Sequence, residues 1–111
     1  MNPIKGIAMD EPRIYGKVLS KELIVAVEIY RLTVIEKQEV YFQKLVENLK
    51  GKSRASSPAT ISKALDVLLD LGMADAEWKQ LPNGRWARSL KISGESKIFV
   101  RTVYKKTCKS G

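Results

Sequence analysis

The stretch SSPATISKALDVLLDLGM, residues 56–73, carries the clearest helix signals in this sequence. Ser57 can cap a helix, and Pro58 suits the first helical position because the N–H that proline lacks would be unsatisfied there. Gly72 stands where a helix would end. The apolar stripe at helical spacing consists of Ile61, Leu65, Leu68 and Leu69. The stretch therefore predicts a helix over about residues 58–71, with a small, polar and basic outer face of Ala59, Ser62, Lys63 and Asp66.

Two further helices are predicted before this stretch. Ser20 can cap the segment KELIVAVEIYRLT, whose residues Leu23, Val27 and Tyr30 form an apolar stripe. The segment EVYFQKLVENL, residues 39–49, also has apolar residues at helical spacing. Between them, the β-branched residues of TVIEK, residues 33–37, indicate a short strand.

A hairpin and a fourth element are predicted after it. The runs MADAEWKQ and RWARSLKIS resemble strands, and the pair Asn83-Gly84 between them is a two-residue turn signal. Trp78 and Trp86 flank this turn, and we expect them to pack the hairpin against the body of the protein. Residues 94–106 fit a strand or a helix, and we favour a helix capped by Ser93.

The order of helices followed by a hairpin is that of a winged helix-turn-helix domain, a mainly α, α+β fold with a three-helix core and a hairpin wing. The segments YFQKLVENL, SSPATISKALDVLLDLGMADAE and LPNGRWARSLKISGES resemble the MarR-like and HxlR-like transcription regulators. The resemblance implies that helix 58–71 is the recognition helix and that hairpin 73–92 is the wing. The predicted organisation is an arm at 1–19, a winged-helix domain at 20–107 and a tail at 108–111.

The net positive charge is confined to the second half of the chain. The sequence holds 20 Lys and Arg residues against 12 Asp and Glu residues, a net charge of +8. Residues 1–49 contain seven of each sign, so the whole excess lies in residues 50–111. A polyanion is the natural partner of such a surface, although a solvated basic surface that only aids solubility has the same composition.

The candidate DNA contacts fall into three groups. Cations of the loop before the recognition helix would neutralise phosphates, and they are Lys50, Lys52 and Arg54. Short or basic residues at the start of that helix would approach the major groove, namely Ser56, Ser57, Ala59, Thr60, Ser62 and Lys63. Helix capping alone would also explain the hydroxyl residues among them. The wing contributes Arg85 for a minor groove, with Arg88 and Lys91 on its second strand.

Several function classes are excluded or disfavoured by composition. The chain has one cysteine and no histidine, which excludes an internal disulfide, a conventional zinc site and histidine-based catalysis. Asp66 and Asp70 lie one turn apart but on an exposed face, so no enzyme is predicted. Cys108 is either an incidental thiol or a redox sensor. Without a signal peptide or a long apolar run, the expected location is the cytoplasm, in association with the nucleoid.

We therefore predict a sequence-specific double-stranded DNA-binding protein, a transcription regulator without cofactor, metal or membrane contact. The alternative is a winged-helix module that binds proteins or RNA, because fold does not fix function. We expect a homodimer formed through the arm, the first helix and the C-terminal segment, since these hold more apolar side chains than a small core can bury. The sequence does not specify a small-molecule effector.

Overall fold

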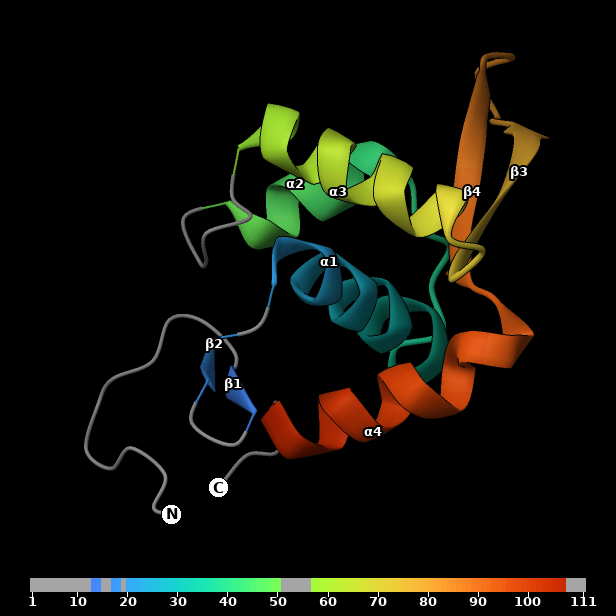
Figure 1. Ribbon diagram of the computed structural model, residues 1–111. Helices are drawn as coiled ribbons and strands as arrows, with labels where there is room; N and C mark the ends of the chain where they lie inside the picture. The colour runs from blue at the N-terminus through green and yellow to red at the C-terminus, as the bar shows by residue number, and fades with distance from the viewer. Residues whose placement is uncertain (1–12, 15–16, 19, 51–56, 108–111) are drawn as a thin grey trace.

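The computed structural model describes residues 13–14, 17–18, 20–50 and 57–107 (Figure 1). The helices of this part are α1 (Lys21–Tyr30), α2 (Phe42–Leu49), α3 (Pro58–Asp70) and α4 (Lys97–Thr107). The strands are β1 (Arg13–Ile14), β2 (Lys17–Val18), β3 (Ala74–Gln80) and β4 (Trp86–Ile92). β1 pairs with β2 and β3 pairs with β4, both antiparallel.

Helix α1 lies at the centre of the molecule, between α3 and α4 (Figure 1). The Ser20 side chain caps it by accepting a hydrogen bond from the Leu23 N–H at 3.2 Å, as predicted. Its apolar side chains are buried nearly all the way round, which is typical of a helix covered by other helices on several sides. These residues are Ile24, Val25, Ala26, Val27, Ile29 and Tyr30. The core is therefore built around α1.

The predicted strand at TVIEK is wrong, because the chain continues from α1 as a π-helical segment, Arg31–Ile35. Leu32 is buried in the core, and the Thr33 hydroxyl donates to the Ile29 carbonyl at 2.8 Å. The Arg31 guanidinium donates to the carboxylates of Glu28 and Glu36, each at 2.7 Å. The hydrogen bond to Glu28 raises the pKa of Arg31, while partial burial opposes it. Burial and ion pairing thus outweigh the β preference of single residues.

Helix α3 follows the predicted pattern closely. Ile61, Leu65 and Leu68 are buried, whereas Leu69 is only half-buried. The helix ends at Gly72, whose φ of 75° is the left-handed conformation that glycine adopts without strain. The Met73 N–H then donates to the Leu68 carbonyl at 2.9 Å, which satisfies a carbonyl at the helix end.

The wing hairpin has a different turn from the predicted one. The Gly84 N–H donates to the Leu81 carbonyl at 2.9 Å, and the Leu81 N–H donates to the Arg85 carbonyl at 2.7 Å. Pro82 and Asn83 are therefore the central residues, and Gly84 follows with a φ of 87°. This is a three-residue loop with a left-handed glycine rather than a two-residue turn on Asn83-Gly84. Proline sets this choice, because its fixed φ suits the second position of such a turn.

The segment 94–106 is helical, as favoured from the sequence. Gly94–Ser96 forms one 3₁₀ turn, and α4 continues from it. Ser93 precedes this turn, but its hydroxyl makes no capping hydrogen bond; it is buried and has no hydrogen-bond partner among the described residues. The prediction that the Ser93 side chain caps the helix is therefore wrong, although the helical segment starts where it was predicted.

The winged-helix fold class is confirmed: helices pack around α1, and the two-stranded wing extends beyond them (Figure 1). Val40 forms an isolated antiparallel β-bridge with Leu90 of the wing, in which the Leu90 N–H donates to the Val40 carbonyl at 2.8 Å. The side chains of the arm and Cys108 lie outside the described residues, whereas the backbone of β1 lies against α4.

No helix in the described ranges combines the length and the apolar character that crossing a bilayer requires.

Candidate nucleic-acid interface

The start of α3 is held by a compact hydrogen-bond pair. The Ser57 hydroxyl oxygen accepts from the Thr60 N–H at 3.2 Å, and the same hydroxyl donates to the Thr60 hydroxyl at 2.9 Å. Both side chains are thus already used in capping, as their residue types allowed. Ser57 is exposed and Thr60 is half-buried at the N-terminal end of the helix. That end of a helix carries partial positive charge and favours an anion.

The outer face of α3 is exposed along its length. Ala59, Ser62 and Lys63 point away from the buried stripe, together with Asp66 and Asp70. Short side chains at the first turn would let the helix backbone approach a groove closely, and Lys63 supplies the long basic side chain. The described part of this face therefore has the composition expected for the reading face of a recognition helix.

The predicted loop cations are only partly described. Lys50 is exposed at the end of α2. Lys52, Arg54 and Ser56 lie in residues 51–56, outside the described residues. The placement of these three relative to α3 stays a prediction.

Arg88 and Lys91, both predicted to contact DNA from the second strand of the wing, lie on opposite faces of the hairpin. In the register of the hairpin Arg88 is opposite Trp78, whereas Lys91 is opposite Asp75. Neighbouring residues in a strand point to opposite faces, so Arg88 shares its face with the buried Leu90, and Lys91 lies on the other face. Arg85 is exposed at the end of the turn, where its backbone N–H donates to the Asn83 side-chain oxygen at 2.9 Å.

The two tryptophans do not pack the wing against the body, contrary to the prediction. Trp78 and Trp86 are each 62% exposed. They occupy the same face of the hairpin as Arg88. Trp78 and Arg88 line a groove with Tyr41 and Phe42 at the start of α2, so Trp78 borders the body but remains largely exposed. Aromatic residue type alone gave no means of telling a packed tryptophan from an exposed one.

An ion pair between Lys79 and Glu39 links the wing to the segment before α2. The Lys79 ammonium donates to Glu39, and the Tyr41 hydroxyl donates to the same carboxylate at 2.6 Å. The hydrogen bond from Lys79 lowers the pKa of Glu39, and the bond to Glu39 raises the pKa values of Lys79 and Tyr41. Lys79 is thus occupied within the protein, which leaves Arg85, Arg88 and Lys91 as the basic residues of the wing without a described ion-pair partner.

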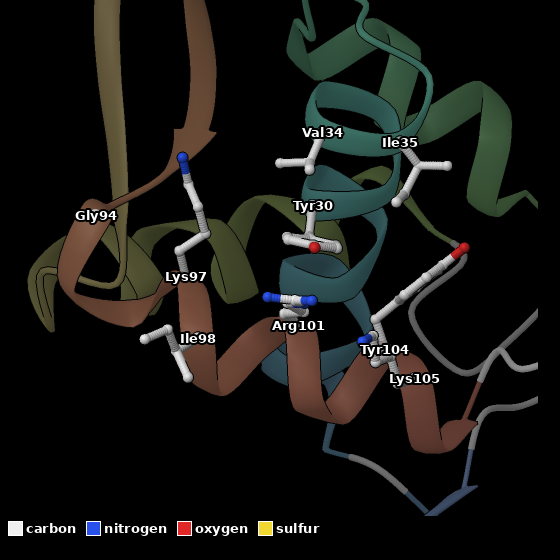
Figure 2. Close-up of a pocket in the computed structure, with 9 residues that line it drawn as sticks. All are labelled: Tyr30, Val34, Ile35, Gly94, Lys97, Ile98, Arg101, Tyr104 and Lys105. Atoms are coloured by element: carbon white, nitrogen blue, oxygen red, sulfur yellow. The ribbon is translucent and has the colours of Figure 1, made fainter.

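A second hollow lies between the π-helical segment and α4 (Figure 2). Its basic lining residues are Lys97, Arg101 and Lys105. The sequence contained a signal for them, since they are spaced four residues apart and fall on one side of a helix. No group of three His, Cys, Asp or Glu side chains suited to a metal ion occurs within the described ranges.

Comparison with solved structures places the fold beside two cyanobacterial proteins. The circadian clock associated protein Pex from Anabaena matches with a TM-score of 0.60 and 22% identity, over 78% of this chain and 76% of that chain. Pex from Synechococcus sp. matches with a TM-score of 0.58 and 22% identity, over 78% of each chain. No protein-family model and no curated protein matches the sequence. The likeness to Pex supports the same conclusion as the helices and hairpin described above: the chain has a winged-helix fold.

Proposed function

We propose that this protein binds double-stranded DNA in a sequence-specific manner and regulates transcription, without catalytic activity of its own. Helix α3 would enter the major groove with Ala59, Ser62 and Lys63 outward, and the wing would reach the adjacent minor groove with Arg85. The structural likeness to Pex, a circadian clock associated protein, is compatible with a regulatory role. Membership of the MarR-like or HxlR-like regulators remains part of this proposal.

The observation that carries the proposal is the exposed outer face of α3 together with the unpaired cations of the wing. Figure 1 shows α3 and the tip of the wing on the same side of the molecule, away from α4. Lys63, Arg85 and Arg88 are exposed, and none is ion-paired with a described residue. Their positive charge is therefore available to phosphates and base edges.

We expect binding to duplex DNA to weaken steeply as salt rises. If the loop and the wing contact about four to six phosphates per protomer, the log–log slope of affinity against salt should be about −4 to −5 per protomer, because each contact releases counterions. A mobility-shift titration over a range of salt concentrations measures this slope. Absence of duplex binding at low salt would contradict the proposal and favour the alternative of a module that binds proteins or RNA.

We also propose a homodimer, with a narrower interface than the sequence indicated. The buried residues of α1 are covered within one protomer, so the first helix offers little apolar surface to a partner. On α4, by contrast, Ile98 is 75% exposed and Phe99 is 51% exposed. Neighbouring exposed apolar side chains of this size mark an interaction surface. The α4 surface, with the arm, is therefore the proposed contact.

The dimer predicts a mass of two chains by light scattering at about tens of micromolar, a concentration range that detects weak association. Phe99→Ser should shift the protein toward the monomer, whereas Trp86→Ser removes an even more exposed aromatic, at 62% against 51%, from the wing and should leave the mass unchanged. A wild-type monomer throughout this range would contradict the dimer.

A further inference from the structure

The wing and the start of α2 enclose a hollow with an aromatic lining, which we call the aromatic groove. Its volume is about 450 Å³, and its aromatic lining residues are Tyr41, Phe42 and Trp78. From its lining and charge we propose that the groove, together with Trp86 beyond it, binds unpaired bases of single-stranded DNA. The choice of DNA over RNA rests on the proposed function, whereas the stacking of unpaired bases does not.

The exposure of the two tryptophans is the first indication of a stacking surface. Trp78 and Trp86 are each 62% exposed, on the same face of the hairpin. Trp78 is opposite Arg88 and Trp86 is opposite Gln80, so the two indole rings belong to adjacent cross-strand pairs of that face. Side chains of adjacent pairs are close enough for long or aromatic residues to reach one another. A strand whose bases stack on both rings would remove their apolar faces from water.

The body of the protein supplies the second wall of the groove. Tyr41 and Phe42 are half-buried at the start of α2, and the buried residues Leu65 and Leu90 also line the hollow. The Tyr41 hydroxyl donates to Glu39 at 2.6 Å, which restrains its ring. An aromatic wall that is already ordered loses little conformational freedom when a ligand binds.

The charge of the groove favours a ligand that carries phosphate. Arg88 lines it, is exposed, and has no ion-pair partner among the described residues. No described Asp or Glu lines the groove, and Glu39 beside Tyr41 is paired with Lys79. A nucleic-acid strand presents a base and a phosphate at each step. Aromatic rings with a guanidinium beside them therefore match its chemistry.

The bases must be unpaired to use this surface. In a duplex each base is covered on both faces by its neighbours in the stack, so aromatic side chains meet base faces only after a strand has opened. Because Leu65 of α3 lines the groove, a strand that opens from a duplex at α3 would lie near it. A proline-rich peptide also suits aromatic grooves, but it brings no negative charge to Arg88.

Fluorescence titration of the full chain with a thymidine oligonucleotide of about ten nucleotides tests the proposal, a length that single-strand-binding domains cover. Trp78 and Trp86 are the two tryptophans of the sequence, so tryptophan emission reports on the wing alone. Base stacking should quench this emission. An abasic strand of the same length carries the same phosphates without bases, and it should bind about tenfold or more weakly.

Trp78→Leu and Trp86→Leu should each weaken binding of a labelled thymidine oligonucleotide by about tenfold, the effect of losing one stacked base. Trp78→Phe keeps an aromatic ring and should restore most of the affinity. Phe99→Leu is the matched control, because it removes an exposed aromatic residue from α4 and keeps an apolar side chain there. It should leave the affinity unchanged, and thermal unfolding of each variant verifies that the fold is retained.

The strand-binding and duplex-binding proposals can fail separately. Lys63→Ala should weaken binding to the preferred duplex and leave binding of the thymidine oligonucleotide unchanged. Equal affinities for the thymidine and abasic strands, or wild-type affinity in both Trp78→Leu and Trp86→Leu, would overturn the stacking site. Binding of a polyproline peptide without binding of the oligonucleotide would also overturn it. Tighter binding of a uridine oligonucleotide than of the thymidine one would overturn the assignment to DNA.

Discussion

Ile29→Ala should reduce the free energy of unfolding by about 2–5 kcal/mol, the range for large-to-small changes in a packed core. Ile29 is fully buried in α1, which packs against both α3 and α4. Removing its outer carbons leaves a cavity in the core around α1, and surrounding helices that are held by other contacts close such a cavity only in part. Urea unfolding followed by circular dichroism gives the change directly.

Ile98→Ala is the control for this measurement, since it makes the same substitution in a helix at a position that is 75% exposed. Its effect should stay within about 0.5 kcal/mol, as for most surface substitutions. The comparison must be made at a concentration where the protein is monomeric, because Ile98 belongs to the proposed dimer surface. Equal effects of the two substitutions would contradict the central position of α1 in the core.

Lys63→Ala should separate the specificity of DNA binding from its affinity. If Lys63 meets base edges in the major groove, its loss should cost about 1–3 kcal/mol on the preferred site and much less on random duplexes. The side chain is exposed, so the melting temperature should hardly change. Competition titrations require the preferred sequence, which selection from a random duplex pool would supply.

Lys52→Ala is the comparison for Lys63→Ala, because Lys52 lies in the loop before α3 and is predicted to contact phosphate. It should weaken binding to specific and random duplexes about equally and reduce the salt slope by about 1. Unchanged affinity of Lys63→Ala for both kinds of duplex would show that α3 is not the reading element.

Local signals made α3 and the hairpin predictable. A capping serine, a proline at the first position and a terminal glycine act within a few residues, so Ser57, Pro58 and Gly72 define their helix without reference to the rest of the chain. The outer face of α3 follows from the same periodicity. These residues also form the part of the candidate DNA interface that the sequence could predict.

The errors have a common physical origin in contacts between distant residues. TVIEK has the residue types of a strand, yet the burial of Leu32 and the ion pairs of Arg31 keep it helical. Trp78 and Trp86 remain 62% exposed, although Trp78 lines a groove with Tyr41 and Phe42. Whether a segment is helical or a tryptophan is buried depends on which elements pack against it. The secondary-structure preferences of single residues do not specify that packing.

The hollow between the π-helical segment and α4 shows the same division. The spacing of Lys97, Arg101 and Lys105 is visible in the sequence, but the pairing of this row with Tyr30 is not, because the two belong to elements at opposite ends of the described chain. Only the packing of α4 against α1 brings them together.

The central position of α1 also has a consequence for protein synthesis. α1 is complete at Tyr30, whereas α4, which covers one of its sides, begins only at Lys97. A chain emerges from the ribosome with its N-terminal part first, so the apolar side of α1 that faces α4 has no permanent cover until α4 has left the exit tunnel. During that interval Tyr30 and its neighbours are accessible to chaperones, and the core is complete only after α4 has been synthesised.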